Sequence, residues 1–361
     1  MMKAFVTGGS GFIGQYVVRK LVERGWDVYA LARSDRSAAI VTNLGATAVP
    51  GDITDTASMR PGMEGSDVVF HIAAWYKIGA ADWMRAEAVN VGGTRRVLRL
   101  AQELDIPKVV YVSTVAVFGD THGQLVDETY FNAGPFATEY ERTKWLAHYK
   151  VAVPLIEKGV PITIVMPGGV YGPGDHSAIA TMMRLFYRGL SVLPGPEMTA
   201  TYAHVEDVAE GIILAAEKGR PGESYILAGP AIPLGEMVDF WGHLLGKRPP
   251  ALRIPAHYLR PLAPVVDLLH SLIPGLPDIF SGEAIRTLGA TYMARSDKAR
   301  AELGWKTRPL QTGMLETFLW IDATEPPVVR QREKKAALAA VGLAILLLLF
   351  WLSGRRDKRN S

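Results

Sequence analysis

The stretch Phe5-Val6-Thr7-Gly8-Gly9-Ser10-Gly11-Phe12-Ile13-Gly14 decides the fold of this chain. It reads as a short apolar strand, a glycine turn and a helix that begins near Phe12. Gly9, Gly11 and Gly14 match the G-x-G-x-x-G spacing, which allows a tight turn and a close approach of the backbone to a pyrophosphate. The helix N-terminus then offers N–H groups to the phosphates. We predict a dinucleotide-binding unit here, with an ordinary strand-to-helix turn as the alternative.

Length and composition narrow the function classes. A chain of 361 residues can hold one large or two modest domains, and a net charge of only +3 argues against nucleic acid as the main partner. The absence of cysteine excludes disulfides, thiolate catalysis and cysteine-based metal sites. His71 has no second metal-type ligand near it in the sequence, so we expect it to pack or hydrogen-bond inside the protein. We predict no metal site.

Apolar strand patterns alternate with helical patterns along the first half of the chain. The strands are expected at 27–32, 46–50, 68–74, 109–113 and 161–166. This alternation is typical of a doubly wound parallel α/β sheet of the Rossmann type. We assign 1–166 to a dinucleotide-binding domain and 167–325 to a smaller substrate-binding region, in which 201–217 packs back on the cofactor domain. The apolar run 262–269 is assigned to the core by default, with pocket lining or contact with a membrane surface as alternatives.

Residues after the second strand indicate which nicotinamide cofactor is used. An acid there binds the free 2′-hydroxyl of NAD, whereas arginine accommodates the 2′-phosphate of NADP. Arg33 directly follows the strand and Asp35 comes later, so NADP(H) is favoured and NAD(H) stays open. Asp52 is a candidate acceptor for the adenine amino group, and helix capping with Asp55 in the first turn is its alternative. Ala73, at the end of a buried strand, is small enough to let a cofactor lie against the backbone.

Three polar residues are placed to carry chemistry. Thr114 lies just past the carboxyl end of a strand, where ligands bind in such sheets. Tyr140 and Lys144 are four residues apart and therefore project from the same face of a helix.

Together these features resemble the extended short-chain dehydrogenase/reductase family, also called the NAD-dependent epimerase/dehydratase family, in its dihydroflavonol 4-reductase-like and 3β-hydroxysteroid dehydrogenase-like branch. The resemblance covers about residues 3–322. The motifs that carry it are Thr7-Gly8-Gly9-Ser10-Gly11-Phe12-Ile13-Gly14, Gly51-Asp52-Ile53-Thr54-Asp55, His71-Ile72-Ala73-Ala74, Asn90-Val91-Gly92-Gly93-Thr94, Ser113-Thr114, Tyr140-x-x-x-Lys144 and His204-Val205-Glu206-Asp207-Val208-Ala209.

The resemblance implies a role for each site residue. Tyr140 would be the general acid/base on the substrate oxygen. Lys144 would hold the nicotinamide ribose and stabilise the phenolate, because a free tyrosine has a pKa near ~10. Thr114 would hydrogen-bond the reacting oxygen, with Ser113 as its close substitute. The implied cofactor contacts are Gly8, Gly9, Ser10, Gly11, Phe12, Ile13, Gly14, Arg33, Asp52, Ile53, Ala73, Ala74, Asn90, Lys144 and Pro167.

Departures from the family pattern narrow the reaction. Val115 and Ala116 replace the acidic pair that sugar-nucleotide dehydratases carry after the threonine, and Met166 replaces an arginine common in sugar-nucleotide members. We therefore expect an NADP(H)-dependent reductase or dehydrogenase acting on a ketone or secondary alcohol of a lipophilic, steroid-, isoprenoid- or flavonoid-like molecule. The alternatives are an NAD-retaining sugar or sugar-nucleotide epimerase and a non-catalytic NADP(H)-binding membrane scaffold. A homodimer is expected only by analogy with the family.

The C-terminal sequence predicts a membrane anchor. Ala336 to Leu352 is uncharged, and 336–354 approaches the ~20 residues needed to cross a bilayer, with a buried core helix as the alternative. A basic linker at 326–335 precedes it and a basic tail at 355–361 follows, so flanking charge does not set the orientation. The need for a nucleotide cofactor places the catalytic domain in the cytoplasm.

Overall fold

Strand β1 (Lys3–Thr7) lies inside a seven-stranded sheet in which every pairing is parallel. The strand order is β3-β2-β1-β4-β5-β6-β10. The other strands are β2 (Asp27–Ala32), β3 (Thr47–Pro50), β4 (Val68–His71), β5 (Val109–Val112), β6 (Ile162–Pro167) and β10 (Ser224–Leu227). The order reverses between β1 and β4, which creates the crevice where such sheets bind ligands. The expected doubly wound α/β sheet is confirmed.

The protein is represented by a computed structural model that describes residues 1–76, 82–272 and 281–324. Within these ranges no helix is both long and apolar enough to cross a membrane. The predicted anchor at 336–354, its linker at 326–335 and the tail at 355–361 lie outside the described residues.

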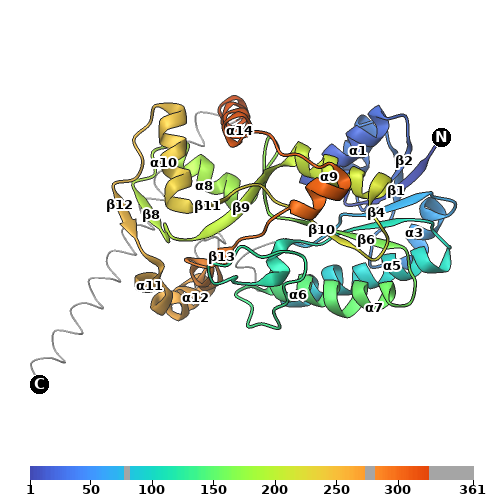
Figure 1. The fold of residues 1–361 in the computed structure, drawn as a ribbon, viewed down its shortest axis with the longest axis horizontal. Helices are drawn as coiled ribbons and strands as arrows, with labels where there is room; N and C mark the ends of the chain where they lie inside the picture. Colours follow the sequence, from blue (N-terminus) through green and yellow to red (C-terminus); the bar gives the residue numbers. More distant parts are fainter. Residues whose placement is uncertain (77–81, 273–280, 325–361) are drawn as a thin grey trace, which may run out of the picture.

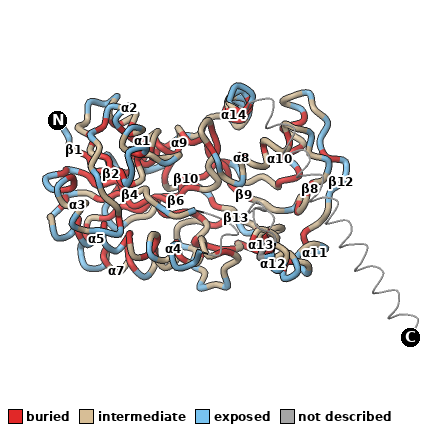
Figure 2. Tube along the Cα trace, turned by 180° about the vertical axis from the view of Figure 1, so that it is seen from behind, coloured by how far each residue is buried: buried red, intermediate tan, exposed pale blue. Residues whose placement is uncertain are grey.

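Helices cover both faces of the sheet (Figure 1). One face carries α1 (Phe12–Glu23), α2 (Asp35–Asn43) and α9 (Val205–Lys218), and the other carries α3 (Thr56–Met63), α5 (Thr94–Glu103), α6 (Glu139–Ala147) and α7 (Val153–Ile156). The strands are buried on both sides, so their valine-rich sequences show no alternation. Buried residues accordingly follow the strands in Figure 2.

Short helical turns lead into two of these helices. The helix α4 (Trp83–Glu87) continues through a π-helical turn, Ala88–Gly93, into α5. A second π-helical turn, His148–Ala152, joins α6 to α7. A 3₁₀ turn, Val115–Phe118, follows β5.

The rest of the chain forms a smaller region beside the carboxyl ends of the strands. The strand β9 (Thr199–His204) pairs with β7 (Gly169–Tyr171), β11 (Ala231–Pro233) and β13 (Thr291–Tyr292), while β8 (Val192–Pro194) pairs with β12 (Leu252–Ile254). Its helices are α8 (Ala178–Tyr187), α10 (Leu234–Leu245), α11 (Ala256–Leu259), α12 (Ala263–Leu272), α13 (Gly282–Thr287) and α14 (Leu310–Thr324). Phe186, Trp241 and Phe318 meet in a separate aromatic core.

The two regions interleave along the sequence. The strand β10 joins the seven-stranded sheet although it follows β7, β8 and β9 in the chain. The helix α9 lies against α1, where Arg19 pairs with Glu206 at 3.0 Å and Lys20 pairs with Glu210 at 3.4 Å. The helix α9 and the strand β10, within residues 205–227, therefore contribute to the cofactor half of the fold, beyond the 1–166 range.

The apolar run 262–269 departs from the default expectation of core. Ala263 is buried, but Val265 and Leu268 on α12 are 43% and 59% exposed. The reason is that Asp267 faces α13, where its carboxylate accepts a hydrogen bond from the Gly282 N–H at 2.8 Å and pairs with Arg286. A short helix held on its polar side leaves its apolar side outward.

Candidate active site

The glycine turn brings β1, α1 and the end of β4 into close contact. Gly8 has φ +77°, and a Cβ built on it would lie 2.6 Å from the Ala73 nitrogen. A Cβ on Gly14 would lie 2.0 Å from the Gly8 carbonyl oxygen. Gly9, by contrast, has an ordinary φ and meets the side chains of Val18 and Ala30. The strictest need for glycine is therefore at 8 and 14, whereas the spacing argument singled out 9, 11 and 14.

The first turn of α1 fits a pyrophosphate. Gly11 is the N-cap of this helix and provides no side-chain cap to its first N–H groups. Gln15 bends back and donates to the Ser10 carbonyl at 3.0 Å, which braces the turn. Phe12 and Ile13 begin the helix here and are only partly buried. The Gly11 N–H donates to the Gly8 carbonyl at 2.9 Å and closes the turn, and the N–H groups of the first helical turn are of the kind that binds a diphosphate.

The end of β2 carries an open basic site. Arg33 and Arg36 are exposed and form no ion pair with any described residue. Between them Ser34 caps α2 through a reciprocal pair of hydrogen bonds with Ser37. The cap fixes the backbone while both guanidinium groups stay available to a ligand.

The 52–55 loop contains Asp52 and Asp55, for which the sequence left helix capping and contact with the adenine amino group as alternatives. Asp55 is the N-cap of α3 and accepts from the Ala57 N–H at 3.0 Å. One carboxylate oxygen of Asp52 accepts from the N–H and the hydroxyl of Thr54, at 2.9 and 2.8 Å. Ile53 is buried against Gly93, where a Cβ would lie 2.5 Å from its side chain. The loop therefore sits directly on the turn that opens α5.

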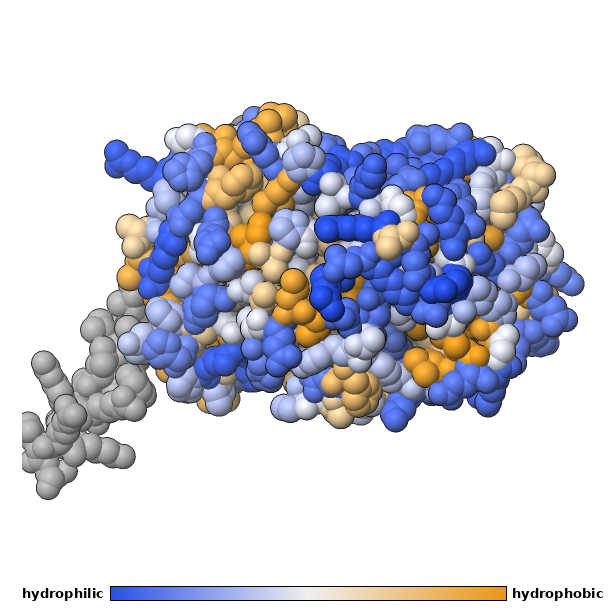
Figure 3. Space-filling view, in the orientation of Figure 1, coloured by the Kyte–Doolittle hydropathy of each residue, from blue (hydrophilic) through white to orange (hydrophobic). Residues whose placement is uncertain are grey.

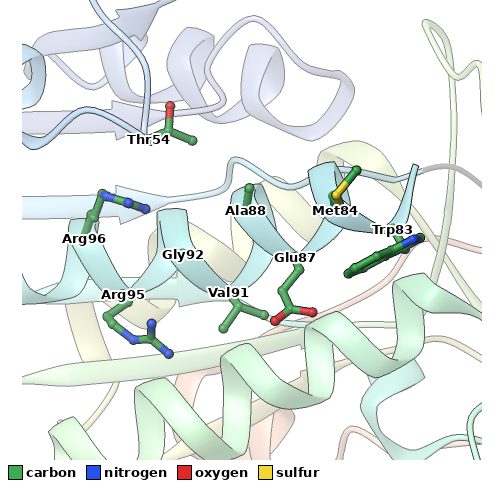
Figure 4. Close-up of a pocket in the computed structure, with 9 residues that line it drawn as sticks. All are labelled: Thr54, Trp83, Met84, Glu87, Ala88, Val91, Gly92, Arg95 and Arg96. Carbon is green, nitrogen blue, oxygen red and sulfur yellow. The ribbon is translucent and has the colours of Figure 1, made fainter.

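A groove of about 430 Å³ adjoins this loop. Figure 4 shows Thr54 on one side and the helical segment 83–96 on the other. Its lining residues are Thr54, Trp83, Met84, Glu87, Ala88, Val91, Gly92, Arg95 and Arg96. None of Thr114, Tyr140 and Lys144 lines it, so the groove borders the predicted adenine end and not the predicted catalytic residues.

Thr114 and Tyr140 meet where β5 ends and α6 begins. Thr114 caps the 3₁₀ turn by accepting from the Ala116 N–H at 3.2 Å, and its hydroxyl donates to the Pro167 carbonyl at 3.4 Å. Thr138 caps α6 and so fixes the turn that carries Tyr140. Burial raises the pKa of Tyr140 to about 12, against a hydrogen bond with the Thr114 side chain that lowers it. The structure therefore brings Thr114, Pro167 and Tyr140 together.

Lys144 lies one turn after Tyr140 on α6 and is only 2% exposed. Its ammonium group donates to the Val112 carbonyl at 2.9 Å and to the Tyr111 hydroxyl at 3.3 Å. Burial lowers the pKa of Lys144 to about 7, because no carboxylate among the described residues compensates the desolvated charge. The amine is held in place before any ligand arrives.

A buried polar network surrounds Lys144. His71 bonds the Thr7 hydroxyl through Nδ1 at 2.8 Å and the Thr94 hydroxyl through Nε2 at 2.9 Å, and its ring stacks on Tyr111. Burial, together with the Lys144 charge, lowers the pKa of His71 to about 3. His71 thus hydrogen-bonds inside the protein, as expected. Ser113, the substitute for Thr114, is occupied by His148 at 2.8 Å.

Asn90 joins the loop after β4 to α6. Its amide bonds the Trp75 backbone at 2.7 and 3.0 Å and the Thr143 hydroxyl at 3.0 Å. These bonds hold the segment that carries Ala73 and Ala74, and Ala73 also donates to the Thr7 hydroxyl at 3.3 Å. Asn90 therefore shapes the predicted cofactor wall, with most of its own bonding capacity used by protein.

Sequence reasoning missed Tyr111, Thr143 and Trp75. Only Tyr111 left a signal, since it places one hydroxyl in the otherwise apolar strand Val109–Val112. Within the described ranges no cluster of three or more His, Cys, Asp or Glu residues is arranged to hold a metal ion.

Residues 4–228 match the family described as "NAD dependent epimerase/dehydratase family". The chain belongs to this family. It is 33% identical to a 4-hydroxy-2-methyl-3-oxo-4-farnesyl-3,4-dihydroquinoline-1-oxide ketoreductase of Stigmatella aurantiaca, covering 85% of this chain and 92% of that protein. It is 28% identical to sterol demethylase protein B of Methylococcus capsulatus, covering 88% and 98%.

A solved structure of gox2253 superposes with a TM-score of 0.77 at 31% identity, covering 90% of this chain and 98% of that chain. Family membership, the glycine turn and the oxidoreductase relatives together make the chain an NAD(P)-dependent enzyme of the extended short-chain dehydrogenase/reductase type.

Proposed function

We propose that this protein is a membrane-anchored, NADP(H)-dependent reductase or dehydrogenase that acts on a ketone or secondary alcohol of a lipophilic molecule. The observation that carries the proposal is the meeting of Thr114 and Tyr140 above the buried Lys144, at the carboxyl edge of the sheet. The glycine turn lies along the same edge, where the nicotinamide of a bound dinucleotide would supply the hydride.

The proton chemistry follows from the surroundings of Tyr140. A phenol whose pKa is raised to about 12 keeps its proton at neutral pH and can donate it to the oxygen of a carbonyl undergoing reduction. The Thr114 hydroxyl holds that oxygen. In the oxidative direction Tyr140 takes the proton back, and a cationic Lys144 stabilises the phenolate. The low pKa of Lys144 makes its charge depend on what binds above it.

The NADP(H) preference is supported by the end of β2. The 2′-phosphate of NADP carries charge that Arg33 and Arg36 would neutralise, and no described protein group competes for either guanidinium. NAD(H) would leave both arginines without an ionic partner.

The substrate class is supported by residues and by relatives. Val115 and Met166 are buried beside the site and offer no charge to a sugar or a diphosphate. The two curated relatives are named for a sterol and for a farnesyl-substituted quinoline oxide. The uncharged run Ala336–Leu352 would keep the enzyme at the membrane in which such molecules dissolve, with the catalytic domain in the cytoplasm.

A turnover screen tests the proposal. The full chain in detergent is mixed with lipid-soluble ketones and NADPH, and the loss of NADPH absorbance is followed, with secondary alcohols and NADP⁺ in parallel. We expect at least one lipophilic ketone or alcohol to be turned over. Cofactor that co-purifies with the protein, together with sugar-nucleotide epimerisation without added NADP(H), would instead establish an epimerase. Unchanged cellular function of a Tyr140→Phe variant would establish a scaffold.

A further inference from the structure

Helices α11 and α12 present an apolar surface on the outside of the molecule. We call Tyr258, Val265, Leu268 and Leu272 the α11–α12 surface; they are 53%, 43%, 59% and 66% exposed. The last three are spaced three and four residues apart, so they share one face of α12. A single exposed leucine is ordinary, but three large apolar side chains on one exposed helix face, with Tyr258 exposed on the preceding helix, indicate contact with something apolar.

Two exposed cations lie in the segment that carries this surface. Within residues 247–272, Arg248 and Arg260 have no ion pair with a described residue, whereas Arg253 pairs with Asp239 and Lys247 donates to the Tyr187 carbonyl. The acid Asp267 pairs with Arg286. Arg260 is exposed and anchors its guanidinium Nε–H on the Leu288 carbonyl at 2.8 Å. An apolar helix face with a tyrosine and basic flanks is the composition of helices that lie in the interface of a membrane with anionic lipids.

The α11–α12 surface is connected to the catalytic tyrosine through two hydrogen bonds. Asp267 of α12 accepts from the Gly282 N–H of α13 at 2.8 Å. Glu283, the next residue of α13, accepts from the Glu139 N–H at 2.9 Å, and Glu139 directly precedes Tyr140. The outward apolar face and the reacting phenol thus belong to one connected part of the molecule.

The predicted anchor would place a bilayer close to the catalytic region. Eleven residues, 325–335, separate the end of α14 from the uncharged run that begins at Ala336. At roughly 3.3–3.6 Å per extended residue they span at most about 40 Å. A chain anchored by 336–354 would hold its catalytic region within that distance of the membrane.

We propose that the α11–α12 surface rests in the headgroup region of an anionic bilayer, so that a lipophilic substrate passes from the membrane to the Tyr140 site without crossing water. This inference rests on the anchored reductase proposed above. The helix α14 is the competing surface, because Leu315 and Leu319 are exposed and hydrophobic residues gather over it (Figure 3). The sequence of α14 contains Glu316 and Asp322 but no lysine or arginine, and Glu316 is paired with Arg308, so α14 itself supplies no cation to an anionic surface.

Single-cysteine labelling measures which surface meets lipid. The chain has no cysteine, so Val265→Cys, Leu272→Cys, Leu319→Cys and Ala39→Cys each give one attachment point for an environment-sensitive fluorophore. Ala39 is exposed on α2, at the opposite end of the molecule from α12 (Figure 2). The full chain is reconstituted in vesicles of phosphatidylcholine and phosphatidylglycerol, with brominated lipid as the quencher.

We expect blue-shifted emission and strong quenching at 265 and 272, and neither effect at 39. Labels at 265 and 272 that stay as exposed to water as the label at 39, in a chain that has entered the vesicles, would overturn the surface and leave the anchor intact. A shift at 319 without one at 265 and 272 would overturn it in favour of α14. Shifts that occur in detergent and grow with protein concentration would overturn it in favour of self-association. A full chain that fails to enter vesicles would reject the anchor and the surface together.

Charge substitutions then test the consequence for turnover. The double variant Val265→Glu/Leu272→Glu should turn over a bilayer-dissolved ketone at least tenfold more slowly, because a single lost apolar contact is already worth about that factor. A water-soluble ketone should be reduced at the unchanged rate, and Leu319→Glu should change neither. Equal rates on the bilayer-dissolved ketone would contradict the proposal. Absence of any turnover by the unmodified chain, with labels 265 and 272 still quenched by lipid, would reject the reductase and retain the surface.

Discussion

Lys144 and Arg33 are two cations predicted to touch the same cofactor, yet they lie in opposite surroundings. Lys144 lies on α6 and is 2% exposed, and its ammonium group donates to the Val112 carbonyl and the Tyr111 hydroxyl of β5. Arg33 follows β2, exposed and without an ion pair among the described residues. The glycine turn after β1 lies between these two ends of the sheet edge. The Lys144 ammonium is therefore fixed by protein groups before any cofactor binds. The Arg33 guanidinium would acquire its ionic partner only from a bound ligand.

Replacing Tyr140 by phenylalanine tests the chemical end and should have the largest effect. Loss of the acid/base group should lower kcat by about a hundredfold to ten-thousandfold. The affinity for NADPH, measured by fluorescence titration, should stay unchanged because the aromatic ring remains. Tyr149→Phe is the control, since that hydroxyl lies further along the same helical segment, 3.5 Å from the Tyr130 carbonyl. Turnover preserved in Tyr140→Phe would remove the assigned acid/base.

Replacing Gly14 by alanine tests the turn between the two ends. The new Cβ would lie 2.0 Å from the Gly8 carbonyl oxygen, so α1 must move away from the turn. Overpacking of this kind costs about 1–3 kcal/mol, and the displaced N–H groups should bind NADPH and NADH equally poorly. Thermal unfolding and cofactor titration measure both effects. Gly92→Ala is the control for overpacking, because its Cβ would meet the flexible end of Arg96 at 2.9 Å and the Glu87 carbonyl only at 3.9 Å. Equal behaviour of the two variants would show that the turn tolerates a side chain.

Replacing Arg33 by serine tests the open end. If the guanidinium binds the 2′-phosphate, the variant should lose about tenfold in its preference for NADPH over NADH, measured as the ratio of kcat/KM values. The kcat with saturating NADPH should change little, because Arg33 is remote from Tyr140 in the sheet order. Arg99→Ser, an exposed arginine on α5, should leave the ratio as it was. An unaltered ratio in Arg33→Ser would favour NAD(H) use or assign the phosphate to Arg36.

The contrast also explains what the sequence could and could not predict. The spacing of glycines, the ends of β2 at Asp27 and Ala32, and the shared helix of Tyr140 and Lys144 are local properties, so local pattern sufficed. The roles assigned to Thr114, Tyr140, Lys144 and the cofactor contacts stay predictions, although the structure brings the first three together.

Partners distant in the sequence could not be predicted. The bonds of His71 to Thr94 and of Asn90 to Thr143 join residues 23 and 53 positions apart, and no periodicity reports them. The default assignment of 262–269 to the core was wrong for Val265 and Leu268, because apolar composition does not tell which side of a helix finds a partner.

A further predicted effect belongs to Lys144 and concerns stability. Burial lowers its pKa from 10.5 in the unfolded chain to about 7 in the folded one. Between these values the unfolded chain holds a proton that the folded protein has released, so the free energy of unfolding should rise with pH across this window. The slope is at most about 1.4 kcal/mol per pH unit. Below pH 7 both states carry the charge, and the penalty for burying it is fully present.

Comparing the unmodified chain with Lys144→Met isolates this contribution. The difference in unfolding midpoint between the two proteins should move in favour of the unmodified chain as the pH is raised from 6 to 9, without cofactor. Lys150→Met, which removes an exposed lysine one turn beyond α6, should show no such trend. The positive nicotinamide ring of bound NADP⁺ would lower the pKa of Lys144 further and should extend the trend to lower pH. A difference in unfolding midpoint that does not change with pH would mean that Lys144 stays charged throughout this range. Lys144 and Arg33 would then differ in exposure alone.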